Sequence, residues 1–214
     1  MKINLTRRTA IHGLASGAMG LLLQRRFAYA ELLASPASTG TRTDKPGVEL
    51  TLTAVNDHTL RIAIAAIDEA LDDTYSDGSL ISRSWPRPLL HAEPSQEPQS
   101  LAWGKNTIKV STTPLRLTVE HGNRVLQELT FDAAANKILF LYGDAPVYGL
   151  GGGLHPLDRR GTKDAMRNGS GENLRIYGAR TPIPWLIGAS GWGLFFHEPG
   201  GTFDLTGDTG IFHP

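Results

Sequence analysis

The sequence predicts an all-β protein, an antiparallel β-sandwich, and three observations indicate it. From residue 48 onward, short segments carry an apolar residue at every second position, which is the period of a half-buried strand. Clusters of Asn, Asp, Gly and Pro separate these segments at nearly regular spacing. Helix-like windows are confined to the N-terminal segment and to residues 67–72. Many short strands with so few helical windows are typical of a sandwich.

The predicted strands begin with a hairpin, 48–55 and 59–67, joined by the turn residues Asn56, Asp57 and His58. The polar, proline-rich stretch 71–100 is expected to be a long loop, with one short irregular strand as the alternative. Further strands are predicted at 106–112, 115–122, 124–131, 137–143, 183–188, 191–198 and 201–207.

Residues 1–30 have the pattern of an export signal, and the pattern looks like the twin-arginine type. The pair Arg7-Arg8 precedes a weakly apolar run, and Ala28-Tyr29-Ala30 is a small-x-small cleavage site. That run is about 13 residues, too short to span a bilayer as a helix. The alternatives are a Sec-type signal and a short N-terminal helix. We therefore expect an exported protein, periplasmic or extracellular, with a linker at 31–47 and one domain at 48–214.

The charge of the chain argues against two classes of partner. The whole sequence carries 21 basic and 21 acidic residues, and residues 1–30 hold five of the basic residues and no acidic one. The processed chain would keep 16 basic and 21 acidic residues, a net charge of −5. A mildly acidic protein of this kind is not expected to bind nucleic acid or an anionic membrane. The absence of cysteine means that the fold depends on its core and not on disulfides.

The glycine-rich stretch VYGLGGGLHPLDRRG, residues 147–161, raises the question of a phosphate-binding loop. A dinucleotide fingerprint needs a third glycine where Leu154 stands, and it needs a helix where His155-Pro156 follows. The order Gly161-Thr162-Lys163 is also wrong for a P-loop. We therefore predict a strand that ends in a wide turn, where glycine permits positive φ and close backbone approach, and we predict no nucleotide cofactor.

Four short motifs occur in order along the second half of the chain. They are Tyr148-Gly149-Leu150-Gly151, Leu157-Asp158-Arg159-Arg160-Gly161, Ile183-Pro184-Trp185-Leu186 and Gly191-Trp192-Gly193-Leu194-Phe195. The series resembles the N-terminal domain of glycoside hydrolase family 31, the α-glucosidase and α-xylosidase family, over residues 48–212. The resemblance implies a galactose-mutarotase-like sandwich, not necessarily complete at its C-terminus, that packs on a (β/α)8 barrel.

The resemblance also implies a function. Family 31 enzymes hydrolyse α-glycosides with retention, using two aspartates on the barrel, while the sandwich supports the barrel and helps to wall the sugar pocket. This sequence contains no W-x-D-M-like nucleophile motif and no barrel sequence before Pro214. We therefore expect no catalytic residue, no cofactor and no turnover from this chain alone, with carbohydrate and a barrel domain as the partners of the full enzyme.

Two positions depart from the family pattern. Gly152 stands where the family usually has glutamate, and Met166-Arg167-Asn168-Gly169 replaces an aromatic-plus-aspartate segment. The preferred sugar therefore cannot be inferred from the resemblance.

The candidate substrate-binding residues lie on the loop that the resemblance places at the pocket lip. Charged side chains there can bind sugar hydroxyls through charge-assisted hydrogen bonds. The alternative is that they tie the 151–180 loop to the sandwich or to a barrel. The candidates are Asp158, Arg159, Arg160 and Arg167. Asp204 and Asp208 are the nearest approach to a carboxylate pair, but aspartate beside glycine is first of all turn chemistry.

Aromatic and histidine residues give weaker signals. Trp185, Trp192, Phe195 and Phe196 are expected in the core because they fall on predicted strands, whereas Trp85 and Trp103 lie near loops and are expected to be more exposed. No histidine has a metal-ligand partner at short spacing, so no metal site is predicted. Two other functions remain open: a free-standing carbohydrate-binding module, and an aldose-epimerase-like enzyme, which needs a histidine and a carboxylate that converge in a cleft.

Overall fold

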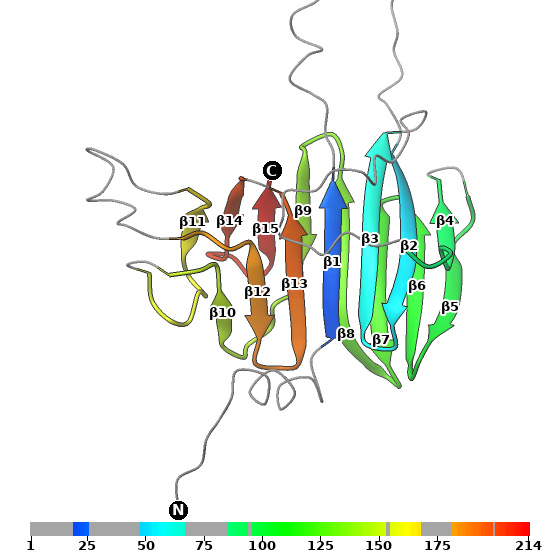
Figure 1. Cartoon of the computed structure of the whole chain (residues 1–214), viewed down its shortest axis with the longest axis horizontal. Coiled ribbons are helices and arrows are strands. Elements are labelled where there is room, and N and C mark those ends of the chain that lie inside the picture. The colour runs from blue at the N-terminus through cyan, green and yellow to red at the C-terminus, as the bar shows by residue number, and fades with distance from the viewer. Residues whose placement is uncertain are drawn as a thin grey trace, which may run out of the picture.

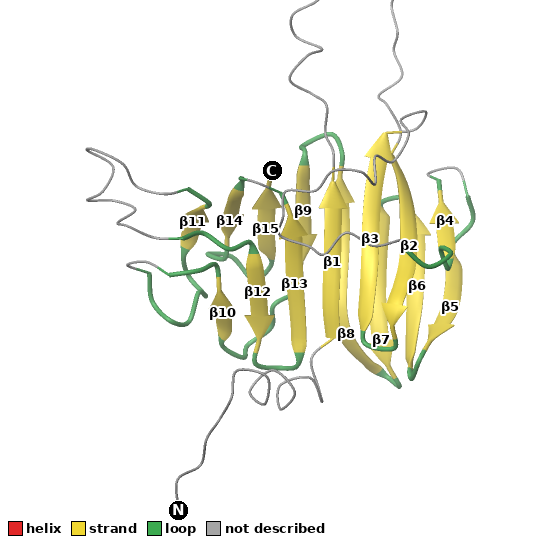
Figure 2. Cartoon of the chain, in the orientation of Figure 1, coloured by secondary structure: helices red, strands yellow, loops and turns green. Residues whose placement is uncertain are grey.

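The structure is a computed structural model of the chain, and it describes residues 19–25, 48–66, 85–93, 96–152, 155–167, 181–198 and 200–214. Every regular element in these ranges is a strand, and the strands form two sheets that lie face to face (Figures 1 and 2). The predicted all-β sandwich is therefore confirmed. Within the same ranges there is no helix with the length and apolar character needed to cross a bilayer.

The first sheet contains the glycine-rich segment at one edge. Its strand order is β10 (Val147–Gly149), β12 (Trp185–Gly188), β13 (Trp192–His197), β1 (Met19–Arg25), β3 (Thr59–Ala66), β2 (Val48–Asn56) and β4 (Leu90–Ala92). The hairpin of β2 and β3 follows the predicted alternation. Leu50 and Leu52 are fully buried, because every second side chain of a strand points to the same face.

The second sheet is a long antiparallel meander with a short extension. Its order is β11 (Lys163–Ala165), β14 (Thr202–Asp204), β15 (Gly210–His213), β9 (Lys137–Phe140), β8 (Arg124–Asp132), β7 (Leu115–His121), β6 (Asn106–Thr112) and β5 (Gln99–Trp103). β7 gives the alternation in its simplest form: Leu115, Leu117 and Val119 are buried, and the residues between them are partly exposed.

An aromatic cluster joins the two sheets. Phe196 of β13 packs on Phe212 of β15 and Phe203 of β14, with ring centroids 4.6 Å and 5.0 Å away, and on Phe140 of β9 at 5.8 Å. These distances fall in the range in which aromatic pairs add stability beyond burial of area. All four rings are at most 1% exposed. The cluster fixes the first sheet on the second near the strands that carry the glycine-rich segment.

β1 differs from the other strands in direction. It runs parallel to both of its neighbours, with Leu21 opposite Leu60 of β3 on one side and Leu194 of β13 on the other (Figure 1). Every other pairing between described strands is antiparallel. This strand comes from the segment that the sequence predicts to be an export signal. The rest of that segment and the predicted linker lie outside the described residues.

The stretch predicted as a long loop contains more regular structure than expected. β4 and β5 both lie within or at the end of 71–100, and β5 brings Trp103 into the core at 3% exposure. The expectation that Trp103 is exposed is therefore wrong. Its indole Nε1 donates to the carbonyl of Asn56 at 2.9 Å, a partner that only the tertiary fold supplies. The predicted helical window 67–72 lies outside the described residues.

Candidate functional site

The glycine-rich segment forms a tight corner at the end of β10, which we call the glycine corner (residues 149–152). Three consecutive residues, Gly149, Leu150 and Gly151, have positive φ angles of 117°, 60° and 77°. A Cβ atom on Gly149 would lie 2.0 Å from the carbonyl oxygen of Trp185, and one on Gly151 would lie 2.0 Å from that of Thr181. The corner thus needs glycine for both conformation and space, as predicted, although the turn is tight where a wide one was expected.

Arg159 holds the corner from inside. Its side chain is 6% exposed, and its Nε and one Nη donate to the carbonyl oxygens of Gly149 and Gly151, both at 2.9 Å. Its backbone N–H donates to the carbonyl of Val147 at 2.7 Å. The corner therefore turns carbonyl oxygens toward a cation. A phosphate site would present N–H groups instead, so the geometry is opposite to that of a phosphate cradle.

A buried carboxylate lies on the far side of the same arginine. Asp164 on β11 is 1% exposed, and its Oδ2 lies 3.9 Å from an Nη of Arg159 and 3.8 Å from Nε2 of His155. Asp164 could not be identified from sequence, because a lone aspartate between lysine and alanine carries no motif. Burial of an acid beside a buried arginine is the signal that identifies it, and only the fold supplies that signal.

Asp158 and Arg160 form a second, more exposed pair beside the corner. The Arg160 guanidinium donates to both carboxylate oxygens of Asp158, with the shortest contact at 2.6 Å, and the backbone N–H of Val147 donates to Oδ1 at 3.1 Å. The Arg160 hydrogen bonds, followed by that of Val147, hold the pKa of Asp158 well below its usual range. The hydrogen bonds to the Asp158 carboxylate in turn raise the pKa of Arg160. Arg160 also donates to the carbonyl of Asp144, so the pair closes the loop onto the start of β10.

The structure brings three of the four candidate residues together. Asp158 bonds to β10, Arg159 bonds to the glycine corner, and Arg160 bonds to Asp158 and to the carbonyl of Asp144 before β10. Arg167 lies at the exposed end of the segment after β11. The observed contacts of the first three tie the loop to the sandwich. Contact of any of the four with sugar stays a prediction.

The other carboxylate candidates occupy a turn. Asp204 accepts hydrogen bonds from the backbone and hydroxyl of Thr206 at 3.1 Å and 2.6 Å and lies 3.3 Å from Lys163. The Thr206 bonds, with a smaller contribution from Lys163, lower the pKa of Asp204. Asp208 is exposed. Nearby, burial raises the pKa of Tyr142, which donates to the carbonyl of Leu205 at 3.2 Å. These contacts agree with turn chemistry.

Aromatic residues divide between the core and the outer face of the first sheet. Trp192 and Phe196 are buried in the core, as predicted. Phe195 is 8% exposed and stacks between Trp185 and His197, with centroid separations of 5.7 Å and 6.0 Å. Trp185 is only half-buried. His197 packs against Phe195, whereas Nε2 of His155 lies near the carboxylate of Asp164, so the two histidines contact different residues.

Large apolar side chains remain exposed around the glycine corner. Leu157 is 79% exposed, and Ile183 and Ile187 are 47% and 42% exposed. Ile183 precedes β12 at the point where Gly151 approaches the chain, and Ile187 lies on β12 opposite Tyr148. Such a group at one edge of a sheet is typical of a surface that contacts another protein segment. We refer to Leu157, Ile183 and Ile187 as the apolar edge.

Together these features define the chain as a two-sheet β-sandwich whose first sheet ends in a glycine corner fixed by a buried arginine. No protein-family model and no curated protein matches the sequence. Among solved structures, a GH31 dextranase of Flavobacterium johnsoniae, complexed with isomaltotriose, is a weak structural neighbour. It has 21% sequence identity and a TM-score of 0.43, and the match covers 54% of this chain and 16% of the dextranase chain. This chain thus spans a small part of that enzyme's length.

Proposed function

We propose that this chain is the sandwich domain of an exported, retaining α-glycoside hydrolase similar to family 31, and that it supports a (β/α)8 barrel and helps to wall the sugar pocket. The observation that carries the proposal is the position of the four sequence motifs. They fall in two sequence segments, 148–161 and 183–195, and they occupy the adjacent strands β10, β12 and β13 and the loop that Arg159 joins to β10 (Figure 1). Motifs that build one continuous structural unit are better support than the same motifs scattered over the surface.

The apolar edge supports the part of the proposal in which the sandwich packs on a (β/α)8 barrel. Leu157 and Ile183 belong to the motifs, Ile187 directly follows one of them, and the charged Asp158–Arg160 pair comes directly after Leu157 in the loop. An apolar patch with a polar rim is the usual composition of a protein–protein contact. A barrel domain seated on this edge would bury these side chains and bring the loop of residues 155–161 close to the barrel.

Two measurements test the proposal together. The coding DNA after the codon for Pro214 should continue in frame into alternating strand and helix patterns with a W-x-D-M-like motif. The purified chain alone should not turn over aryl α-glucosides or α-xylosides, because the two carboxylates that retaining hydrolysis requires belong to the barrel. Turnover above that of a heat-inactivated sample, or a stop codon with no barrel sequence in the locus, would contradict the proposal.

The role of the apolar edge can be tested separately in the full enzyme. Leu157→Ser and Ile187→Ser should change the stability of the isolated chain by less than about 0.5 kcal/mol, because both side chains are exposed. In the full enzyme the same changes should lower thermal stability or kcat/KM. Val125→Ser is the matched control, since Val125 is 45% exposed on β8 of the other sheet. If all three variants of the full enzyme have the same thermal stability and kcat/KM, the apolar edge is not a docking surface.

A second candidate function has one specific observation in its favour. His155 and the buried Asp164 lie 3.8 Å apart, and an aldose epimerase needs a histidine and a carboxylate that act on one sugar. A mutarotation assay on the isolated chain, with His155→Gln as the comparison, decides this alternative.

The alternative of a free-standing carbohydrate-binding module is tested by calorimetry with glucose, xylose and maltooligosaccharides. A binding module should release heat on binding one of these sugars, whereas a supporting domain should release none.

A further inference from the structure

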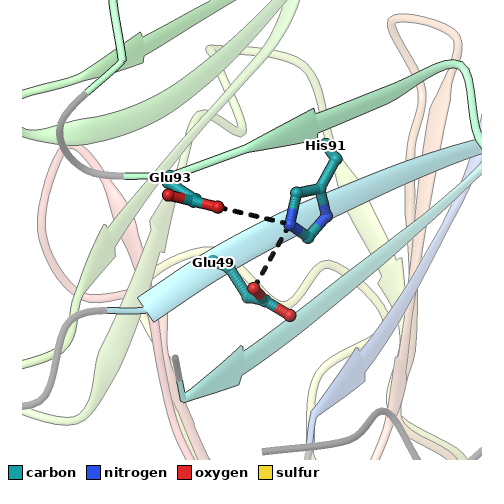
Figure 3. Close-up of side chains that lie close together, drawn as sticks. All are labelled: Glu49, His91 and Glu93. Carbon is teal, nitrogen blue, oxygen red and sulfur yellow. Dashed lines mark ion pairs between the residues drawn. The ribbon is translucent and has the colours of Figure 1, made fainter. Parts of the chain in front are cut away.

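Three side chains with metal-ligand chemistry meet at the β4 edge of the first sheet, well away from the motif residues in the strand order. Figure 3 shows Glu49 of β2, His91 of β4 and Glu93, which follows β4, pointing toward one another. Nε2 of His91 lies 3.2 Å from an oxygen of Glu49 and 3.9 Å from an oxygen of Glu93. The ligand atoms of all three lie within 4.8 Å of one another. We propose that these residues bind a divalent transition-metal ion, with Zn²⁺ as the best fit.

The register of two antiparallel strands brings the three residues together. Thr51 pairs with His91, and Leu50 pairs with Ala92. Leu50 and Ala92 are fully buried on the core face. Because side chains alternate along a strand, Glu49, His91 and Glu93 share the opposite face. The ligands therefore stand on paired strands, a more rigid arrangement than ligands on a loop.

A hydrogen bond at Nδ1 of His91 orients the other ring nitrogen, Nε2, toward the two carboxylates. Nδ1 of His91 lies 3.1 Å from the hydroxyl of Thr51, which is 6% exposed. When Nδ1–H donates to this hydroxyl, Nε2 presents its lone pair to the two carboxylates. A second-shell partner on one ring nitrogen is the usual way in which a protein fixes a metal-binding histidine.

The charge at this position favours a cation. In the part of the chain that the structure describes, the ion pairs of Glu49 and Glu93 are both with His91 and none is with lysine or arginine. When Nε2 of His91 carries no proton, its lone pair and the two carboxylates repel one another unless a cation lies between them. A divalent ion neutralises both carboxylates and uses the lone pair.

The distances and atom types select the class of ion. Zn²⁺ binds nitrogen and carboxylate oxygen at about 2.0–2.2 Å, so two tetrahedral ligands lie about 3.4 Å apart. Nε2 of His91 lies 3.2 Å from the Glu49 carboxylate and 3.9 Å from that of Glu93, whose side chain is 44% exposed. Three protein ligands leave a fourth position for water. Ca²⁺ and Mg²⁺ prefer all-oxygen sites and should bind more weakly.

The sequence alone did not predict this site. The prediction of no metal site overlooked Glu93, which lies two residues after His91. Glu49 belongs to a different strand, and pairing of β2 with β4 is what places it opposite. The proposal is independent of the proposed hydrolase role, because it uses none of the motif residues.

Calorimetric titration of the full chain, freed of metal with a chelator, tests the proposal. We expect one Zn²⁺ per chain at pH 8, and CaCl2 should bind at least about 10-fold more weakly. His91→Gln and Glu49→Gln should each weaken Zn²⁺ binding about 100-fold or more. Thr51→Val should weaken it about 10–100-fold through loss of the orienting hydrogen bond. His121→Gln is the control, because His121 is exposed on β7 in the other sheet.

Each outcome decides the proposal. A single saturable Zn²⁺ site that is lost in His91→Gln and kept in His121→Gln supports it. Absence of saturable binding in the wild type, or equal binding in His91→Gln, overturns it. Circular dichroism of each variant verifies the fold, and Glu93→Gln, a change at an exposed side chain, gives an independent variant if Thr51→Val does not fold.

Discussion

The guanidinium of Arg159 lies 3.9 Å from the carboxylate of Asp164, and the two side chains are 6% and 1% exposed. The arginine also donates to the carbonyls of Gly149 and Gly151. One buried cation thus joins three segments: β11, the glycine corner and the loop before β11. Burial of the pair makes each partner depend strongly on the other, because an unpaired buried charge is much more costly than a solvated one.

Replacement of Arg159 should therefore be severe. Arg159→Met removes the guanidinium beside the buried carboxylate of Asp164 and the two hydrogen bonds to the glycine corner, and we expect a loss of about 3–5 kcal/mol in the free energy of unfolding. Urea denaturation at pH 7 measures it. Lys109→Met is the control, because its ion pair with Glu120 is on the surface, with the lysine 54% exposed, and should be worth at most about 1 kcal/mol. A similar loss in both variants would mean that the buried pair has no special role.

The Asp158–Arg160 pair should make stability depend on acidity. The pKa of Asp158 in the folded protein is below the ordinary value of an aspartate, so the contribution of this group to stability is fully present above about pH 4 and is lost as pH falls further. Asp158→Asn should lower Tm at pH 7, and the difference from wild type should shrink between pH 4 and pH 2. Glu97→Gln, at an exposed residue, is the control. A difference in Tm that stays constant across this range would exclude the pair as its source.

Neighbouring glycines of the corner should respond differently to the same change. Gly151→Ala places a methyl group 2.0 Å from a carbonyl oxygen at a φ of 77°, and we expect a loss of about 2–4 kcal/mol. Gly152→Ala meets nothing within 4 Å, and it should be neutral or slightly stabilising. Chemical denaturation of both variants checks this. If the two variants are equally stable, the tight backbone approach at Gly151 is not present in solution.

Removal of residues 1–30 should open the first sheet. β1 pairs with β3 on one side and β13 on the other, so its loss leaves two unpaired edges in the middle of the sheet. Hydrogen exchange of residues 31–214 should show lost protection in β3 and β13, with protection kept in β6 and β7. Unchanged protection of β3 would mean that β1 does not stabilise the sheet. If removal of residues 1–30 does open the sheet, a processed, exported chain needs another strand between β3 and β13.

Much of the fold follows from local pattern. Alternation at Leu50, Leu52, Leu117 and Val119 predicted strands whose bounds agree with the structure to within a few residues. Short or weakly patterned strands were missed: β4 and β11 have three residues each, and such a segment has too few positions for a period to be recognised. β1 was missed for another reason, since its apolar run has the same composition as an export signal.

The sequence by itself determined the all-β class, most strand positions, and the requirement for glycine at the corner, because these depend on side-chain period and on backbone sterics within a few residues. The tertiary structure decided which groups meet. It turned Arg159 inward to Asp164, buried Trp103, and set Glu49 beside His91. Those contacts join residues from different strands, and strand order and register, not local sequence, determine which strands become neighbours.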